Sequence, residues 1–486
     1  MLFNSYEFIL AAFPISLLVY YGLIIVGKKS TAQGWLISFS LFFYGFFNWS
    51  YLLIICSSIL FNFLFARLIR KCNRYAKFLM TVGIVANVAL IFVYKYFDFF
   101  INNVNAVFNS SIELLHLLLP LGISFFTFQQ ISYLVDTYKG KTEKDSFLDY
   151  ALFVSFFPQL IAGPIVLREE MIPQFHDDKR KRFSAEYFAE GMYFFSLGLA
   201  KKVLIADTLA KGVDWGYSNI QTLSGLSALL ISILYSFQLY FDFSGYCDMA
   251  RGIANCFHID IPQNFNSPYK ANSIDDFWKR WHMSLTRFLT NYVYIPLGGS
   301  RKGKTRTLIN IILVFLVSGI WHGAGWTFVC WGLLHGVASV IHRLIETKWE
   351  KIYKPLACFV TFAFCNLTWI FFRANSISDA LTVICKICTP NQGYFTVPYE
   401  LTQKFITTES QFLINHISVL KQFVQSVPSI VMFGMILVSA AIIWCFPNSW
   451  EKRRKLSPIS CFTCSILFVW ALFSLSGVSA FLYFNF

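Results

Sequence analysis

The chain has 486 residues, of which 56% are hydrophobic, 19% aromatic and only 14% charged, and its mean hydropathy is +0.55. Soluble globular domains carry about 25% charged residues, so this composition excludes that class and indicates a polytopic membrane protein. The formal net charge of +14 would suit nucleic acid as well as a membrane, and the distribution of the charge has to decide between them.

A helix that crosses the hydrocarbon core needs roughly 20 apolar residues, and such runs recur along the chain. They predict membrane segments at residues 8–27, 34–49, 50–66, 78–97, 117–137, 187–206, 223–247, 307–324, 326–343, 355–373, 428–447 and 458–480. The opening MLFNSYEF has no basic region and no small-residue cleavage site, so 8–27 is read as a membrane helix rather than a signal peptide.

One further apolar stretch, residues 148–166, is interrupted by Gly163 and Pro164 and has basic residues on both sides. A broken backbone at membrane depth needs protein or water around it. This stretch therefore predicts a re-entrant or interfacial element rather than a crossing.

The basic residues follow the order of the predicted segments. If the N-terminus lies outside and the segments alternate, most Lys and Arg fall in loops on the cytoplasmic side, which is the positive-inside pattern. Anionic lipid headgroups are then the expected neighbours rather than nucleic acid. The loops concerned include 28–29, 67–77, 139–144, 179–182, 279–306, 343–354 and 452–455.

One long polar interruption, about residues 375–427, contains Pro390, Gly393 and Pro398. It predicts an external loop with short interfacial helices, where a partner protein could dock. Cys385 and Cys388 fall in it, and a disulfide between them is an open question. No other soluble stretch is long enough for a separate module, so residues 1–486 are predicted to form a single membrane domain.

Eight histidines are present, and two of them lie inside the hydrophobic hairpin SGIWHGAGWTFVCWGLLHG. An ionisable residue in such a segment is unfavourable and marks a functional hypothesis, which makes His322 the first candidate. His335 is the second, but on one continuous helix the two would lie about 20 Å apart. A turn at the intervening glycines would change that distance. No cysteine or histidine pattern has zinc-site spacing, so no metal site is predicted.

A third histidine, His282, lies in FWKRWHMSLTRFL, where apolar residues recur at helical spacing between basic ones. The stretch is typical of an interfacial amphipathic helix. A functional alternative is that the basic residues bind phosphates of a nucleotide-bearing donor such as coenzyme A, because Lys and Arg recognise phosphate by charge-assisted hydrogen bonds. The candidates are Lys279, Arg280, Arg287, Arg301 and Lys302.

Five ordered motifs resemble the membrane-bound O-acyltransferase (MBOAT) family. Their order and spacing are most similar to those of its bacterial branch, which contains alginate O-acetyltransferase membrane components and peptidoglycan O-acetyltransferase A proteins. The resemblance covers nearly all of residues 1–480. The motifs are PLGISFFTFQQISYLVDTYKG (120–140), FPQLIAGPIVLREEMIPQF (157–175), QLYFDFSGYCDMARGIA (238–254), NFNSPYKANSIDDFWKRWHMSLTRFLTNYVYIPLGGSRKG (264–303) and SGIWHGAGWTFVCWGLLHG (318–336).

The resemblance implies an all-α fold, a ring of roughly 11–12 tilted helices with re-entrant elements around a central tunnel. It implies that His322, in the WHG motif, is the catalytic histidine and that His282 is the second family histidine. Neutral imidazole can take a proton from a hydroxyl that attacks a thioester. We therefore expect His322 to be the general base and His282 to support it or to position the donor.

The resemblance further implies transfer of acetyl from cytoplasmic acetyl-CoA, with no bound cofactor, towards an extracytoplasmic glycan such as peptidoglycan or an alginate-like exopolysaccharide. A periplasmic or membrane-tethered partner resembling SGNH hydrolases would complete the transfer. The expected location is the bacterial cytoplasmic (inner) membrane, with the N-terminus outside.

Two alternatives remain at this point. A D-alanyl or lipid acyltransferase of the same superfamily would use the same histidines with another donor. A transporter or channel would also place histidine and broken helices at mid-membrane, but pseudo-repeated halves, which such proteins usually have, are not evident in the sequence.

Overall fold

The computed structural model describes residues 1–390, 392–407, 429–452 and 456–475, together with the single residues 411, 416, 424, 427, 481 and 482. Every regular element in these residues is a helix, and none of them forms a strand. The predicted all-α polytopic fold is therefore confirmed. The predictions made for residues 408–428, 453–455 and 476–480 fall largely outside the described residues.

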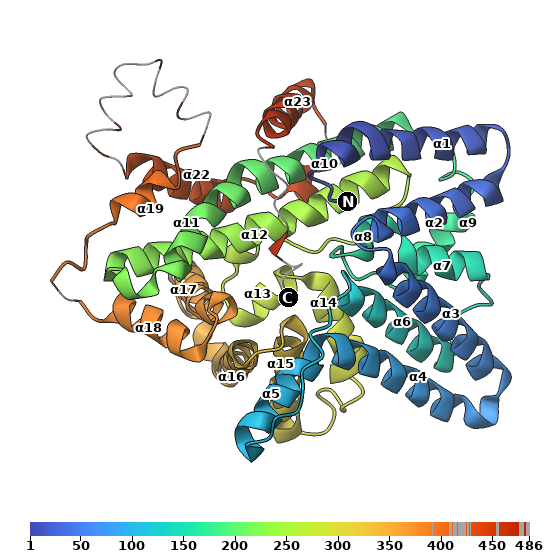
Figure 1. Ribbon diagram of the computed structural model, residues 1–486, viewed down its shortest axis with the longest axis horizontal. Coiled ribbons are helices and arrows are strands. Elements are labelled where there is room, and N and C mark those ends of the chain that lie inside the picture. The colour runs from blue at the N-terminus through green and yellow to red at the C-terminus, as the bar shows by residue number, and fades with distance from the viewer. Residues whose placement is uncertain are drawn as a thin grey trace.

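The longest helix, α12 (Gly225–Cys256), crosses the middle of the molecule and is buried along nearly its whole length (Figure 1). At 1.5 Å per residue its 32 residues span about 48 Å. Helix α10 (Ala185–Ala200) packs along it through glycines. A Cβ on Gly198 would lie 2.5 Å from the carbonyl oxygen of Gly245, and one on Gly252 would lie 2.5 Å from that of Gly191. Small residues thus let the two backbones touch.

Buried ion pairs add to this contact. A π-helical turn, Lys201–Ala206, continues α10 and leads into α11 (Asp207–Ser218). Lys201 Nζ lies 2.6 Å from Asp248 of α12, and Lys202 Nζ lies 2.7 Å from Asp242. Paired charges are the form in which ionisable residues are tolerated inside a membrane protein. Asp242 and Asp248 are thus ion-pair partners of the two lysines that follow α10.

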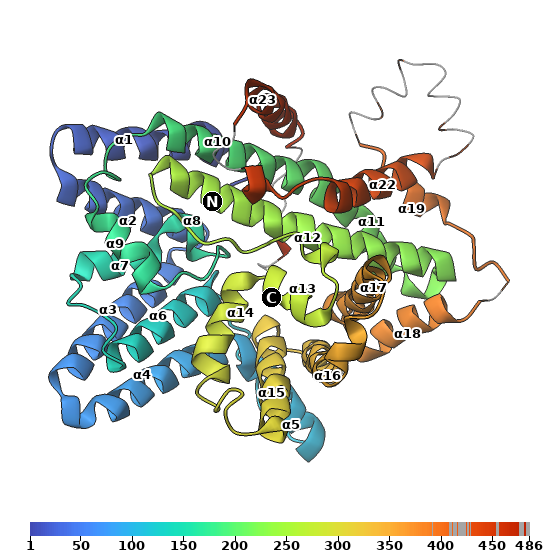
Figure 2. The same ribbon diagram turned by 180° about the vertical axis from the view of Figure 1, so that it is seen from behind.

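The N-terminal helices form a layer beside one end of α12, at the opposite end from α17 (Lys354–Arg373) and α18 (Ile377–Cys388) (Figures 1 and 2). A π-helical turn, Phe92–Tyr96, joins two of them into one long span, Asn73–Phe108. The helices of this layer are α1 (Phe13–Ile25), α2 (Lys29–Gly45), α3 (Ser50–Lys71), α4 (Ala76–Ile91) and α6 (Ile123–Tyr138). Helix α5 (Phe97–Phe108) extends from α4 to a position below the middle of α12 in Figure 1.

The interrupted stretch 148–166 is broken as predicted. Helix α7 (Phe147–Ser155) stops at Phe156, α8 (Phe157–Leu160) is one turn long, and an irregular segment leads to α9 (Arg168–His176). Residues 149–167 are buried throughout. The broken backbone is therefore enclosed by protein, as an irregular segment at membrane depth must be.

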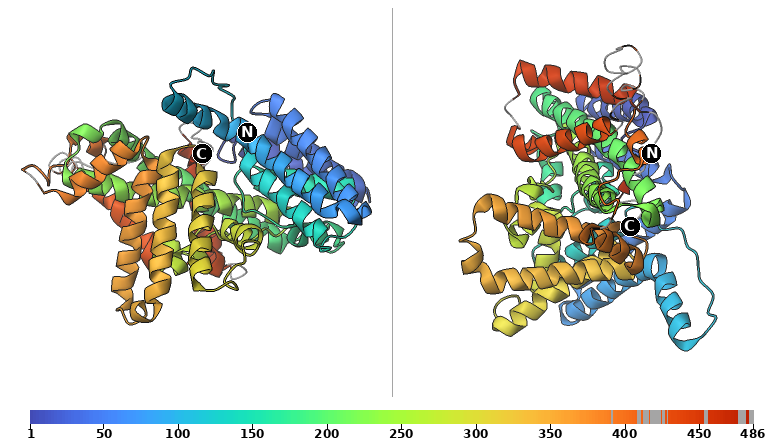
Figure 3. Two further views of the ribbon diagram at one scale, coloured as in Figure 1. Left: turned by 90° about the horizontal axis from the view of Figure 1, so that it is seen from below. Right: turned by 90° about the vertical axis from the view of Figure 1, so that its left-hand side faces the viewer.

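The third group of helices contains the histidine hairpin, α15 (Lys304–His322) and α16 (Trp326–Trp349), followed by α17 (Lys354–Arg373). Helices α15 and α16 lie side by side (Figure 3). A Cβ on Gly319 would lie 2.4 Å from the carbonyl oxygen of Phe328, so this contact also depends on glycine. The hairpin confirms that the chain turns between the two histidines.

The remaining helices lie around these groups. Residues from the predicted external loop form short helices, α18 and α19, and Tyr394 O accepts a hydrogen bond from Leu226 at the start of α12. Cys385 and Cys388 are free thiols on α18. The bounds are α13 (Ile274–Arg280), α14 (Met283–Leu289), α18 (Ile377–Cys388), α19 (Tyr399–Gln403), α22 (Ile430–Cys445) and α23 (Pro458–Phe473).

Seven helical segments of the described chain are long and apolar enough to cross a membrane, which makes this a multi-pass membrane protein. They are Glu7–Ile25, Ser50–Lys71, Asn73–Phe108, Gly225–Cys256, Lys304–His322, Trp326–Trp349 and Lys354–Arg373. The other five predicted segments fold as helices of 16 or 17 residues, namely α2, α6, α10, α22 and α23. Four of them are shorter than the roughly 20 residues of a perpendicular crossing, whereas α10 is continued by the π-helical turn Lys201–Ala206.

Candidate active site

His322 is the last residue of α15, immediately before the Gly323–Gly325 link to α16. Its side chain is only 3% exposed. The imidazole is surrounded by aromatic rings, with centroid distances of 4.8 Å to Trp321, 5.1 Å to Trp331 and 5.2 Å to Phe372. The hairpin thus holds this histidine at a helix end in an apolar environment, where electrostatic interactions are strong.

His282 lies at the break between α13 and α14, in a left-handed backbone conformation with φ of 46° and ψ of 52°. This conformation is unusual for a residue with a side chain, and such residues concentrate at functional sites. The expected single amphipathic helix is therefore wrong, because the helix is broken at Trp281 and His282. Its apolar side chains lie in the protein core rather than among headgroups. They are Trp278, Trp281, Leu285, Phe288 and Leu289.

The two candidate histidines, 40 positions apart in the chain, face each other in the structure. Their ring centroids are 6.4 Å apart, and His282 is fully buried. Trp321 borders both rings, at 4.8 Å from His322 and 6.0 Å from His282. At this spacing one small reacting group could contact both imidazoles. The sequence predicted each histidine as a site residue, but it could not predict that the two side chains lie next to each other.

Asn264, in the segment after α12, determines which nitrogen of His282 carries the proton. Its Oδ1 accepts hydrogen bonds from the backbone N–H of Ser284 at 3.1 Å and from the Ser284 hydroxyl at 2.9 Å. His282 Nδ1 lies 3.2 Å from the same oxygen. The bonds from Ser284 identify this atom of Asn264 as the amide oxygen, which can only accept hydrogen bonds. His282 Nδ1 must therefore carry a proton and donate it to Asn264 Oδ1. Nε2 of the neutral ring then carries the lone pair.

Burial also keeps His282 neutral. It lowers the pKa of this imidazole to about 3, since desolvation disfavours the charged form. The contacts are with Phe243 at 4.9 Å and Phe125 at 6.4 Å between ring centroids. A neutral His282 with a proton on Nδ1 presents Nε2 as a hydrogen-bond acceptor and proton acceptor.

Lys95 contributes to the site and was missed in the sequence. It lies on the π-helical turn of the Asn73–Phe108 span, and its Nζ donates to the carbonyl oxygens of Trp321 at 2.6 Å and His322 at 3.3 Å. The hydroxyl of Tyr96 donates to Ile320 O at 2.8 Å. A cation at a helix C-terminus is favourable, and π-helical turns are frequent at functional sites. The signal in the sequence was a lone lysine in an apolar run.

His335 serves a different purpose. The indole N–H of Trp278 donates to its Nδ1 at 3.2 Å, so Nε2 carries the proton and donates to the Thr368 hydroxyl at 2.9 Å. Both ring nitrogens are therefore occupied. His335 connects α13, α16 and α17 and is not one of the facing pair.

The five residues predicted to bind donor phosphates fall into two groups. Arg280 Nε donates to Asp276 at 2.7 Å, and Arg287 forms a two-pronged ion pair with Glu170. These two guanidinium groups hold protein carboxylates. Lys279, Arg301 and Lys302 are exposed. No cluster of three or more His, Cys, Asp or Glu suited to a metal occurs in the part of the chain that the structure describes.

Comparison with known proteins gives the context of this site. The sequence model of the membrane-bound O-acyltransferase family matches residues 143–377, which contain both histidines. A peptidoglycan O-acetyltransferase of Helicobacter pylori is 43% identical, over 100% of this chain and 98% of the relative. A probable alginate O-acetylase of Pseudomonas aeruginosa is 36% identical over 78% of this chain and 73% of its own length. A teichoic acid D-alanyltransferase of Bacillus subtilis is 31% identical over 49% and 62%.

Proposed function

The chain belongs to the membrane-bound O-acyltransferase family and is an acyltransferase, and we propose that it moves acetyl groups from cytoplasmic acetyl-CoA towards the hydroxyls of an extracytoplasmic glycan. The observation that carries the proposal is the buried pair of His282 and His322, 6.4 Å apart. The two relatives with the highest identities above, which act on peptidoglycan and alginate by their names, support O-acetylation of a glycan.

The chemistry assigned to His322 is general-base catalysis. A neutral imidazole takes the proton of the attacking hydroxyl while the oxygen forms a bond to the thioester carbonyl carbon. The tetrahedral intermediate then collapses, the C–S bond breaks, and the thiolate leaves with the proton returned by the imidazolium. Aromatic walls exclude water, which would otherwise hydrolyse the thioester.

His282 has a supporting role in this proposal. With its proton on Nδ1 directed at Asn264, its Nε2 can accept a hydrogen bond from a reactant N–H or O–H. It is therefore unsuited to stabilise the oxyanion, which needs a donor. We assign that role to backbone N–H groups near Gly323, at the end of α15.

The donor end is proposed to lie on the cytoplasmic face, with the N-terminus outside and the protein in the inner membrane of a bacterium. Lys279, Arg301 and Lys302 are exposed and are the residues assigned to the donor phosphates. Arg280 and Arg287 would have to leave Asp276 and Glu170 to join them, so their assigned role is to hold α13 and α14. An SGNH-type partner outside the membrane would complete the transfer.

The second candidate is D-alanyl transfer, which the Bacillus subtilis relative favours. Purified protein in liposomes, given radiolabelled acetyl-CoA or a labelled D-alanyl thioester with a polysaccharide acceptor, separates the two. The proposal expects His322-dependent transfer or hydrolysis of acetyl-CoA. Activity with the D-alanyl thioester alone would reject acetyl transfer, and solute flux without thioester turnover would indicate a transporter.

The role of Asn264 predicts a change in pH dependence. Asn264→Asp keeps an acceptor oxygen beside His282 Nδ1 but adds a negative charge, which favours the imidazolium and raises the pKa of His282. Because the neutral ring is the active form, activity should be lost at higher pH than in the wild type. The acid limb of the kcat/KM profile measures this shift.

The matched control is Asn272→Asp, which adds the same charge at an exposed position before α13. Its acid limb should stay where the wild-type limb lies. If Asn264→Asp also leaves the limb unmoved, the proposed positioning of His282 by Asn264 is wrong.

Replacement of Lys95 is expected to lower activity, because Lys95 helps to hold His322 in position. Lys95→Met removes the cation that caps the carbonyls of Trp321 and His322, a contribution of about 1 to 2 kcal/mol. If that is lost from the transition state, kcat/KM should fall about 10-fold. Lys77→Met, at an exposed position of the same span, should leave the rate unchanged. Equal rates for both variants would show that Lys95 does not position His322 for catalysis.

A further inference from the structure

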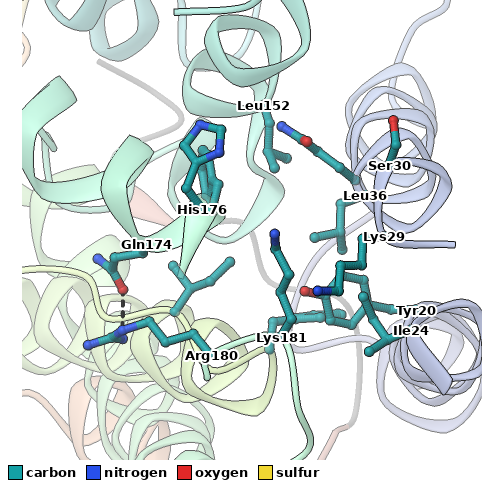
Figure 4. A pocket seen from close by; sticks show the side chains of 14 residues that line it. Tyr20, Ile24, Lys29, Ser30, Leu36, Leu152, Gln174, His176, Arg180 and Lys181 are labelled. Atoms are coloured by element: carbon teal, nitrogen blue, oxygen red, sulfur yellow. Dashed lines mark hydrogen bonds between the residues drawn. The ribbon is translucent and has the colours of Figure 1, made fainter. Parts of the chain in front are cut away.

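A cavity of about 260 Å³ lies away from the histidines, between the turn that joins α1 to α2 and the segment that follows α9. Figure 4 shows Lys29 and Ser30 on one side of it and His176, Arg180 and Lys181 on the other. Both segments belong to loops that the positive-inside pattern places on the cytoplasmic face. Neither His282 nor His322 lines this cavity, so it is separate from the candidate active site.

The polar part of the lining consists of groups that donate hydrogen bonds to anions. It contains three permanent cations, two amides and two hydroxyls, and none of the described residues that line the cavity is acidic. These residues are Lys29, Arg180 and Lys181, Gln33 and Gln174, and Ser30 and Tyr20, with His176 beside them. Such a set matches the acceptor oxygens of a phosphate group.

The cations differ in how far they are already engaged. Arg180 Nη1 contacts Asp260 at 3.0 Å and Gln174 at 2.8 Å, so its role is structural. Lys29 and Lys181 share one carboxylate, that of Asp178, at 2.9 and 3.2 Å. The Asp178 side chain is 68% exposed, and exposed ion pairs contribute little. Two lysines with one solvated carboxylate leave a positive charge for a ligand.

His176 is the remaining titratable group at the cavity. Its Nε2 lies 3.3 Å from Asp149, a carboxylate that also accepts from Gln33 at 2.9 Å. This buried carboxylate contacts His176 and Gln33, and the described residues show no ion pair between it and either lysine. The lysine pair therefore determines the charge that a ligand meets.

The other part of the lining is apolar and continues onto an exposed apolar surface at the end of α1. Ile24 and Leu36 line the cavity beside Phe175 and Phe257. At the end of α1, Ile25 is 84% exposed and Val26 is 70% exposed. Large apolar side chains with that exposure next to a basic cavity suit an amphiphile, with its charged group inside and its acyl chains along α1.

From this combination we propose that the cavity binds the phosphodiester headgroup of an anionic phospholipid from the cytoplasmic leaflet. Sites for complete small molecules usually measure about 300 to 1,000 Å³, so 260 Å³ fits a headgroup better than a whole nucleotide. A soluble phosphate compound would use the same lysines, and the experiment has to separate these two sources.

The test is binding of a fluorescent phosphatidylglycerol to the full-length protein in phosphatidylcholine nanodiscs. Lys29→Gln with Lys181→Gln should weaken this binding on the order of 10-fold, because each lysine near a bilayer contributes appreciably to attraction of anionic lipid. Lys29→Arg with Lys181→Arg should retain it. Coenzyme A and inorganic phosphate, each added in excess, should not displace the lipid.

A matched control removes the same charge elsewhere. Lys351, in the loop after α16, and Lys354, the first residue of α17, are both exposed, and their double change to Gln should leave phosphatidylglycerol binding within about twofold of the wild type. An equal loss in both double variants would show non-specific attraction and overturn the site. Displacement of the lipid by coenzyme A would instead assign the cavity to a soluble phosphate ligand.

Discussion

His322→Ala is expected to reduce acetyl transfer from acetyl-CoA about 10³-fold. General-base catalysis contributes typically 10²- to 10⁴-fold, and in an aromatic enclosure no solvent molecule can readily replace the lost imidazole. The helix that ends at His322 is held by Gly319 against α16 and by Lys95, so the side chain can be removed without losing the hairpin. Initial rates in proteoliposomes measure the effect.

The matched control is His116→Ala, since the His116 side chain is 79% exposed and lies far along the chain from the site. Its rate should stay within about twofold of the wild type, as expected for surface changes. Both variants should elute as the wild type does in size-exclusion chromatography. A His322→Ala protein that keeps more than a tenth of the rate would remove the base from the proposed mechanism.

His282→Ala is expected to cost about 10²-fold in kcat/KM, less than the loss of the base. It removes the Nε2 acceptor next to the reacting group and leaves the Asn264 oxygen with only the Ser284 donors. His282→Gln should recover part of the rate, because the amide oxygen can accept a hydrogen bond while the residue stays neutral.

Steady-state kinetics with varied acetyl-CoA distinguishes the roles open to His282. A rise in KM with an unchanged kcat would indicate that it only positions the donor. A lower kcat is expected from the facing geometry, because the acceptor atom acts on the reacting group. If His282→Ala and His282→Gln are both as fast as the wild type, His282 is a packing residue.

Much of the helical arrangement follows from local sequence. The apolar runs predicted at 307–324 and 326–343 become α15 and α16 because length and hydropathy are local properties, whereas the sequence left open whether the chain turns at the glycines between them. The break in 148–166 was predictable for the same reason, since Pro164 and Gly163 lie within it. His322 was identified because a histidine is unfavourable in such a run.

The pairing of the site residues was not predictable in this way. His282 reaches His322 only because its backbone is left-handed, and helical spacing around it indicated a continuous amphipathic helix instead. Asn264 lies in an irregular segment with no pattern of its own. Lys95 looked like one more charge near the end of an apolar run, and only tertiary contacts show that it caps α15.

The same limit applies to the basic residues. The sequence grouped Arg280 and Arg287 with Lys279 by charge alone, whereas the structure pairs both arginines with carboxylates. Lys29 and Lys181, more than 150 positions apart, were assigned only to orientation and meet at a cavity. Charge composition predicts the side of the membrane, and contacts between distant segments determine individual roles.

If His282 and His322 act on one reacting group, the effects of removing them are coupled, and a comparison of single and double variants measures this coupling. Acetyl-CoA turnover is measured for the wild type, His282→Ala, His322→Ala and the protein with both changes. Residues that act as a unit have strongly non-additive effects, so the double variant should be about as slow as His322→Ala alone. Losses that multiply, about 10⁵-fold for the pair if each single loss is as large as expected, would show that the two histidines act independently and would contradict it.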